Sequence, residues 1–253
     1  MSTPGTCGSG ALSAPWLAEG GGRLDRERPH WRLSPRTAAL SAAVLVGLFA
    51  GLACAVASGR VADLDALVAG WLAGLRHPLV TVLMQAVTWL GSAAFLVPLG
   101  LLTAAWVWSA FPASAALPRR QARHGAWAVL IALSGAWLLN SALKSVFQRA
   151  RPDLPPLSEA FGYSFPSGHA MVTLAFFAVS SYVVAVTFST ARGGRHTHPA
   201  VLAAAAAVVT LLVGLSRIYL GVHFPSDVAA GFAAGAAWAL TVIAGFEWLR
   251  HGR

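Results

Sequence analysis

The segment at residues 216–227 has the sequence SRIYLGVHFPSD and separates two long apolar stretches. It places Arg217, His223 and Asp227 within twelve residues. Charged groups in apolar surroundings are costly, so charges that persist there usually have a function. An arginine suits a phosphate, a histidine suits proton or phosphoryl transfer, and an aspartate four residues later can hold the histidine in one tautomer. The segment therefore raises the hypothesis of a phosphate site, which the rest of the chain must support.

The composition of the chain predicts a membrane protein. Of its 253 residues, 57% are hydrophobic and only 11% are charged, whereas a soluble domain of this length carries about 25% charged residues. The formal net charge is +9, but the basic residues form short clusters between apolar stretches, so no nucleic acid is expected as a partner. The two cysteines, Cys7 and Cys54, indicate neither a disulfide framework nor a metal site.

Six stretches are apolar enough to be predicted as transmembrane helices. Residues 61–76 differ, because their leucines, valines and Trp71 recur on one helical face while Asp63 and Asp65 lie early, where they complement the helix dipole. This pattern predicts an amphipathic helix on the membrane surface. Residues 79–90 are apolar but short, which suggests a re-entrant or interfacial helix. The predicted spans are residues 37–58, 91–108, 125–147, 168–187, 199–217 and 226–249.

The distribution of basic residues predicts the orientation of the chain. Six spans place both termini on one side, and that side carries 12 of the 18 Lys and Arg residues. Cytoplasmic segments are enriched in these residues, so both termini are expected in the cytoplasm of a multi-pass cell-membrane protein. Residues 1–36 are rich in Gly, Ser, Pro and Arg without an early apolar stretch. They are therefore expected to form a disordered cytoplasmic tail rather than a cleavable signal peptide, followed by the membrane domain at 37–249 and a short C-terminus at 250–253.

This topology brings the unusual polar residues of four spans to the extracytoplasmic face. Lys144, Arg151 and Arg217 could neutralise a phosphoryl group without a metal. Ser167 and Gly168 open the fourth span, where a helix N-terminus binds anions and a glycine lets the backbone approach a ligand. His169 and His223 can divide the roles of nucleophile and general acid. The residues alone do not say which histidine is the nucleophile.

Three motifs in this set resemble a known family. Lys144-x6-Arg151-Pro152, Pro166-Ser167-Gly168-His169 and Ser216-Arg217-x5-His223-x3-Asp227 are similar, in residue type, spacing and order, to the three-part signature of the type 2 phosphatidic acid phosphatases. Their superfamily includes the vanadium haloperoxidases. The resemblance implies an all-α, polytopic, haloperoxidase-like helical bundle, here with six transmembrane helices plus an amphipathic interfacial helix.

The resemblance also implies a role for each residue. His223 would attack the phosphorus and form a phosphohistidine, Asp227 would orient His223, and His169 would protonate the leaving oxygen and then activate water. No metal or other cofactor would be needed. The phosphate oxygens would be held by Lys144, Arg151, Ser167, Gly168 and Arg217. Arg149 and Asp153 lie outside the signature and are interpreted as ordinary loop residues.

Other interpretations of these residues remain open. Lys144 and Arg217 could be snorkelling cations at helix ends, and Asp227 could be an N-terminal charge favoured by the helix dipole. A haloperoxidase would hold vanadate in the same pocket, although those relatives are soluble. A non-catalytic lipid transporter or phospholipid-binding protein on the same fold would not need both histidines and Asp227. The sequence therefore predicts a lipid phosphatase acting on phosphatidate, phosphatidylglycerol phosphate or an isoprenoid diphosphate, with membrane lipids around it.

Overall fold

The computed structural model describes residues 31–111, 116–191 and 198–251, and all the regular elements in these ranges are α-helices. The compact unit of the chain begins at Leu33. The predicted tail therefore lies almost entirely outside the described residues. The helices are α1 (Pro35–Ala57), α2 (Ala62–Gly74), α3 (Pro78–Trp89), α4 (Ala93–Ser109), α5 (Ala116–Phe147), α6 (Gly168–Ala191), α7 (Pro199–Tyr219) and α8 (Pro225–His251).

Proline and polar caps explain where several helices begin. Four of the eight helices open on a proline, namely α1, α3, α7 and α8, because proline at the first helical position loses no hydrogen bond and its backbone angle is already helical. Ser34 caps α1 by accepting a hydrogen bond from the backbone N–H of Thr37 at 3.0 Å. Ser92 caps α4 in the same way through the N–H of Phe95. The local sequence therefore sets these boundaries.

The number of membrane spans agrees with the prediction, but the second span is built differently. Five helices are long and apolar enough to cross a membrane alone, namely α1, α5, α6, α7 and α8. At 17 residues, α4 is about 25 Å long, less than the roughly 30 Å hydrocarbon core of a bilayer. The helix α4 reaches a spanning length only together with α3, which is the segment predicted at 79–90 as a re-entrant or interfacial helix. The two helices are bent by 42° at their junction, a geometry that fits a broken span or a re-entrant segment.

The start of the third span, predicted at residue 125, is also corrected. Arg119, Arg120 and Arg123 lie in the first turns of α5, which begins at Ala116 rather than near residue 125. Arginine, glutamine and alanine favour helix, and no glycine interrupts residues 119–124. Arg123 lies over the ring of Trp108 at 4.9 Å. The helix therefore continues past the apolar window from which the span was predicted.

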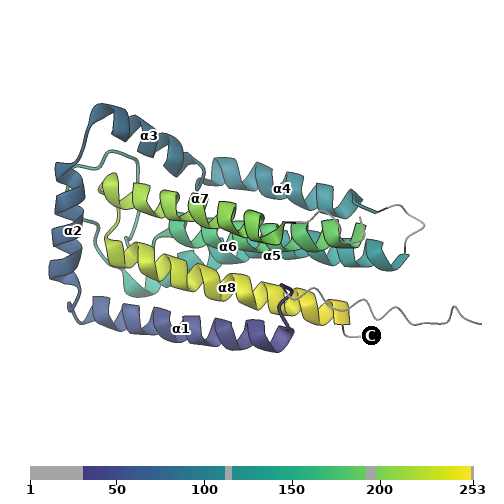
Figure 1. Ribbon diagram of the computed structural model, residues 1–253. Helices are drawn as coiled ribbons and strands as arrows, with labels where there is room; N and C mark the ends of the chain where they lie inside the picture. Colours follow the sequence, from purple (N-terminus) through teal and green to yellow (C-terminus); the bar gives the residue numbers. More distant parts are fainter. Residues whose placement is uncertain (1–30, 112–115, 192–197, 252–253) are drawn as a thin grey trace, which may run out of the picture. The chain divides into compact units, whose positions relative to one another are not determined.

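The centre of the bundle is α6, which packs against α5, α7 and α8 (Figure 1). A close approach of α8 to the start of α6 depends on Gly231, because a Cβ atom there would lie only 2.7 Å from the carbonyl oxygen of Ser167. The backbone N–H of Ser167 in turn donates to the carbonyl of Asp227 at 3.0 Å. The first turns of α6 and α8 are thus joined directly.

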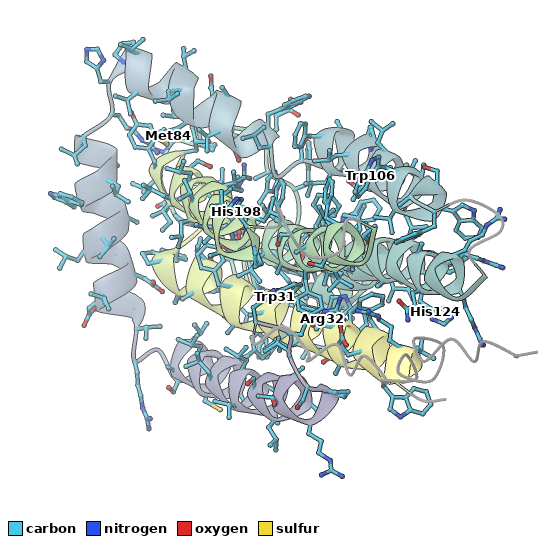
Figure 2. The ribbon with its side chains drawn as sticks, turned by 45° about the vertical axis from the view of Figure 1, so that its right-hand side comes forward. Trp31, Arg32, Met84, Trp106, His124 and His198 are labelled. Atoms are coloured by element: carbon cyan, nitrogen blue, oxygen red, sulfur yellow. The ribbon has the colours of Figure 1, made fainter. Side chains whose placement is uncertain are left out.

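The predicted interfacial helix is present as α2, which lies across one end of the bundle (Figure 1). Leu64, Leu67 and Trp71 on this helix are exposed, as expected of a face that meets lipid, whereas Asp65 and Leu72 are buried toward the bundle. At this same end α7 joins α8. Figure 2 shows Met84 of α3 near the end of α7, where it packs against a cluster of Tyr219, Leu220 and Val222.

Candidate active site

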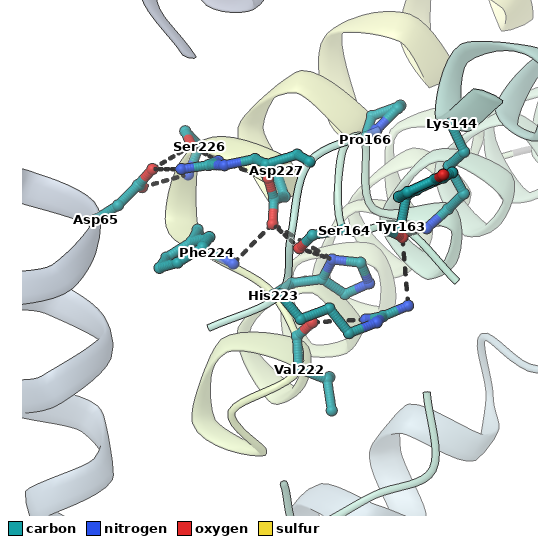
Figure 3. Close-up of polar contacts among 12 residues, drawn as sticks. Asp65, Lys144, Tyr163, Ser164, Pro166, Val222, His223, Phe224, Ser226 and Asp227 are labelled. Atoms are coloured by element: carbon teal, nitrogen blue, oxygen red, sulfur yellow. Dashed lines mark hydrogen bonds and ion pairs between the residues drawn. The ribbon is translucent and has the colours of Figure 1, made fainter. Parts of the chain in front are cut away.

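The structure brings the predicted site residues to the end of the bundle where α2 lies, as the positions of the helix ends in Figure 1 show. Figure 3 shows three of these residues, Lys144, His223 and Asp227. The predicted site residues come from the last turns of α5 and α7, the first turns of α6 and α8, and the two connections between them. These elements end or begin at the same level because the connections 148–167 and 220–224 both return the chain to this end of the bundle. The residues are Lys144, Arg151, Ser167, Gly168, His169, Arg217, His223 and Asp227.

His223 and Asp227 form a buried pair at the centre of the site. His223 Nδ1 lies 3.5 Å from Asp227 Oδ2. The hydroxyl of Ser164 lies 3.3 Å from the same nitrogen and donates a hydrogen bond to Asp227 Oδ2. The backbone N–H of Phe224 donates to this oxygen at 2.8 Å. Since Nδ1 faces the carboxylate, Nε2 is the nitrogen on the side of the ring turned away from it.

Burial sets the protonation state of His223, which is only 2% exposed. Loss of solvation lowers its pKa from the ordinary 6.5 to about 4, although Asp227 acts in the opposite direction. The imidazole is therefore neutral at neutral pH and keeps a lone pair on one ring nitrogen. A neutral imidazole held through Nδ1 can act as a nucleophile through Nε2.

Two residues that sequence reasoning did not assign to the site lie behind Asp227: Arg149 contacts the Asp227 carboxylate, and Asp65 contacts Arg149. Arg149 Nη1 lies 2.7 Å from Asp227 Oδ1, and its Nη2 lies 2.7 Å from Asp65 Oδ2. Asp65 also accepts hydrogen bonds from the backbone N–H and the hydroxyl of Ser226. The interpretation of Arg149 as an ordinary loop residue was wrong, and Asp65 does more than complement the dipole of α2.

Lys144 and Arg151 both turn toward the connection that precedes α6. The Lys144 ammonium donates to the carbonyl of Tyr163. Arg151 donates to the carbonyls of Gly162 at 3.0 Å, Phe161 at 2.8 Å and Val222 at 2.6 Å, and more weakly to that of Tyr163. Burial lowers the pKa of Arg151 and Asp227 raises it, but its guanidinium stays charged at neutral pH. The two cations thus meet at one carbonyl oxygen.

Arg217 and Ser167 each carry a buried polar atom without a hydrogen-bond partner among the described residues. Arg217 is 3% exposed, and its Nη1 donates to the hydroxyl of Thr88 at 2.8 Å. Among the described residues, neither Arg217 Nε nor Ser167 Oγ has a hydrogen-bond partner. Most buried polar atoms in folded proteins are paired. The two unpaired atoms therefore fit an anionic ligand whose oxygens would accept from both.

The start of α6 is shaped by Asn140 of α5. Its side-chain amide donates to the carbonyl of Pro166 at 3.3 Å, and a Cβ atom on Gly168 would lie 2.8 Å from Asn140 Oδ1. Glycine at position 168 is thus required by packing against Asn140, in addition to the close approach to a ligand that the sequence suggested. The turn that carries Ser167, Gly168 and His169 is held in place on this side.

His169 lines a mainly apolar cavity of about 460 Å³ between α4, α5 and α6. The cavity reaches from Gly168 and His169 along the three helices to apolar side chains such as Leu96, Leu101 and Leu130. It therefore leads from the polar end of the bundle into its membrane-spanning part. An apolar chain attached to a phosphate could occupy it while the phosphate lies near the histidines.

A sequence profile of the PAP2 superfamily matches residues 125–250, which include all the predicted site residues. Phosphatidylglycerophosphatase B of Bacillus subtilis is 32% identical over 189 residues, which are 73% of this chain and 84% of that protein. The chain belongs to the PAP2 superfamily. The resemblance seen in the three motifs is thereby confirmed.

Two further likenesses agree with PAP2 membership. The crystal structure of a transmembrane PAP2-type phosphatidylglycerolphosphate phosphatase from Bacillus subtilis superimposes with a TM-score of 0.73 at 29% identity, covering 84% of this chain and 99% of that chain. Decaprenylphosphoryl-5-phosphoribose phosphatase of Mycobacterium tuberculosis is 36% identical over 138 residues, 52% of this chain and 66% of that protein. The predicted all-helical PAP2-type fold and the predicted class of enzyme, a multi-pass membrane lipid phosphatase, are confirmed.

The sequence contained partial signals for the residues that were missed. Asp65 shares a helical face with Ala69 and Leu72, four and seven positions later, so the carboxylate lies on the buried side of α2. Arg149 precedes Arg151 by two positions in the connection after α5. Its closeness to a predicted site residue was the signal that its side chain could also contact the site. Ser164 gave no signal, because its role depends on how the connection 148–167 returns to Asp227. Within the described residues, no three His, Cys, Asp or Glu side chains gather as metal ligands.

Proposed function

We propose that the protein hydrolyses a lipid phosphate in two steps through a phosphohistidine on His223. The observation that carries this proposal is the position of His169, which lies both in the phosphate-binding turn and on the wall of an apolar cavity. A soluble phosphate ester would have no use for such a cavity, whereas a lipid would place its chain there and its ester oxygen beside His169.

In the first step His223 Nε2 attacks the phosphorus. The P–N bond forms as the bond from phosphorus to the ester oxygen breaks, and His169 gives its proton to the leaving alcohol. Asp227 stabilises the positive charge that develops on His223 as its ring becomes doubly substituted. The product of this half-reaction is the free alcohol and a phosphohistidine.

In the second step His169, now without its proton, accepts one from water as the water attacks phosphorus. The P–N bond breaks, its electron pair returns to His223 Nε2, and inorganic phosphate leaves. Charge on the phosphoryl oxygens is offset by Lys144, Arg151 and Arg217, with the hydroxyl of Ser167 and the start of α6 as further donors. This set of donors supplies the electrostatic stabilisation with side chains alone, so the proposed reaction needs no metal.

The names of the relatives suggest the order in which substrates are tested. Phosphatidylglycerol phosphate is the first candidate, because the relatives with the broadest coverage of the chain are phosphatidylglycerophosphatases. A prenyl-linked phosphate comes second, since another relative is a decaprenylphosphoryl-phosphoribose phosphatase. Phosphatidate and isoprenoid diphosphates complete the panel. All share a long apolar chain and a terminal phosphate.

We further propose that the site faces the extracytoplasmic side and that both termini are cytoplasmic. The excess of Lys and Arg on the terminal side supports this orientation. The substrate would then enter from the outer leaflet, since the cavity at His169 opens among the membrane-spanning helices on that side of the bundle.

The proposed function is tested by phosphate release from this panel, with protein purified in detergent and assayed with excess chelator. Wild-type protein should release phosphate with and without chelator, and His223→Ala should lose about 10⁴-fold or more of kcat. His198→Ala is the matched control, because His198 is exposed at the opposite end of α7 from Arg217. Equal release by wild type and His223→Ala would refute the proposed nucleophile, and loss of release with chelator would refute the metal-independent reaction.

A further inference from the structure

Asp65, Arg149 and Ser226 form a cluster of hydrogen bonds and ion pairs next to Asp227. Figure 3 shows Asp65 and Ser226 on the side of Asp227 away from His223. The three residues come from α2, from the connection after α5 and from the first turn of α8. The Arg149 side chain is 17% exposed and the Asp65 side chain only 2%. The proposed reaction uses none of the three. Two buried charges with no chemical task need another explanation, because their desolvation is costly.

We propose that Arg149 and Asp65 are positioning residues for the His223–Asp227 pair, an inference that rests on the proposed function. The two oxygens of Asp227 have different partners: Oδ1 accepts from Arg149 at 2.7 Å, while Oδ2 faces His223 Nδ1 at 3.5 Å. A carboxylate held by one oxygen can turn about its own bond. Arg149 therefore fixes the plane of the carboxylate that orients His223.

Asp65 fixes Arg149 in turn. The guanidinium is bound on one side by Asp227 and on the other by Asp65, and it lies 4.3 Å over the ring of Phe224. A planar guanidinium bound at two nitrogens and stacked on a ring has little freedom to rotate. Without Asp65, Nη2 would lose its ion pair, and the guanidinium would keep Asp227, the hydroxyl of Ser226 and the ring of Phe224 as its partners among the described residues.

The charge balance of the cluster supports the same role. Arg149 alone would neutralise Asp227 and weaken the stabilisation of the positive charge that develops on His223. Asp65 restores a net charge of −1 behind the histidine, since the cluster then holds two carboxylates and one guanidinium. In surroundings of low polarity this difference matters more than it would in water.

The helix that carries Asp65 is itself anchored to the site. Asp65 accepts from the backbone N–H of Ser226 at 2.9 Å, which joins the first half of α2 to the start of α8. At the other end, Arg76 donates to the carbonyls of Pro155 at 2.9 Å and Tyr219 at 3.3 Å. The interfacial helix is therefore a fixed support from which the Asp65 carboxylate reaches Arg149, the partner of Asp227.

The test compares kcat and KM for Asp65→Asn, Asp65→Glu, Arg149→Gln and the double variant Asp65→Asn/Arg149→Gln. Removal of partners that orient catalytic groups costs about 10-fold to 100-fold in activity, so we expect Asp65→Asn to lower kcat about 10-fold with little change in KM. Asp65→Glu should recover part of this loss. If Asp65 acts through Arg149, the double variant should turn over within about twofold of Arg149→Gln alone, since such coupled effects are not additive.

Asp63→Asn is the matched control, because Asp63 lies on the same turn of α2 but is exposed. Thermal unfolding of each variant is measured in parallel, and rates are taken well below the transition so that a loss of folded protein cannot imitate a loss of kcat. Wild-type kcat in Asp65→Asn, or losses that multiply in the double variant, would overturn the positioning role. His223→Ala is assayed alongside: full activity there would refute the proposed function, whereas an inactive His223→Ala with a fully active Asp65→Asn would refute the positioning role alone.

Discussion

Arg149 Nη1 lies 2.7 Å from Oδ1 of Asp227, although the two residues are 78 positions apart in the chain. This contact connects the extended segment after α5 to the first turn of α8, next to the histidine proposed as nucleophile. On the side of Asp227 away from His223, ion pairs therefore link Asp227 to Arg149 and Arg149 to Asp65.

Trapping of the phosphoenzyme can show which of the two histidines is the nucleophile. If His223 is the nucleophile, a rapid alkaline quench with ³²P-labelled substrate should trap phosphate on His169→Ala protein, because hydrolysis of the phosphohistidine is slow without a base and its P–N bond survives in alkali but not in acid. No label should appear on His223→Ala protein. The opposite pattern would assign the nucleophile to His169 and the acid to His223.

Acid should destabilise the wild type more than a variant without His223. The folded-state pKa of about 4 lies below the ordinary 6.5, so between these values the unfolded chain binds more protons and stability falls as the pH falls. Thermal unfolding in detergent should therefore show a larger decrease between pH 7 and pH 4.5 for wild type than for His223→Gln. Equal decreases would show that His223 is not held neutral by burial.

The cavity beside His169 should select for long apolar chains. Val97→Trp places an indole at the cavity wall and should raise KM for a long-chain substrate roughly tenfold, as for the lost burial of about two methylenes. KM for an analogue with four-carbon chains and the same headgroup should not change. Leu102→Trp, on the same helix but outside the cavity lining, serves as the control. An equal effect of Val97→Trp on both substrates would argue against a lipid chain in this cavity.

Arg217 should not be replaceable by lysine. Its guanidinium has one side bound to Thr88 and an Nε atom without a partner among the described residues, a geometry that a single ammonium does not reproduce. Removal of one donor to a developing charge costs about 10²-fold to 10³-fold in kcat, so Arg217→Lys should lose about 100-fold. Arg60→Lys, at an exposed position, should be silent. Near-normal turnover in Arg217→Lys would show that Arg217 contributes only its positive charge and not the geometry of its guanidinium.

The orientation of the site can be measured on intact cells. Glu159 is exposed in the connection 148–167, so Glu159→Cys, in a background with Cys7 and Cys54 changed to serine, should react with a membrane-impermeant thiol reagent. The background without the new cysteine is the control. Labelling only after lysis would place the site on the cytoplasmic side.

Much of the fold was predictable because the membrane simplifies the choice of structure. Apolar stretches must be helical there, since every backbone polar group has to be paired. Five spans could therefore be located directly, and proline marked the start of three of them, namely α1, α7 and α8. The second span was located at α4, but α4 alone is shorter than a bilayer core, and the bend of 42° between α3 and α4 depends on how the two helices pack and not on their composition.

The sequence by itself determined the family and the class of enzyme, and it predicted the residues that would hold and attack a phosphate, because these roles require particular residue types at particular spacings: Lys144 with Arg151, Ser167 with His169, and Arg217 with His223 and Asp227. Only the tertiary structure decided what supports them. Asp65 and Arg149 looked like a charge at a helix end and a loop arginine, since nothing in their local sequence records that Arg149 contacts Asp227 or that Asp65 contacts Arg149 and Ser226. These contacts exist because the connection after α5 and the helix α2 both reach the end of the bundle where α8 begins, and such an arrangement depends on packing among distant segments.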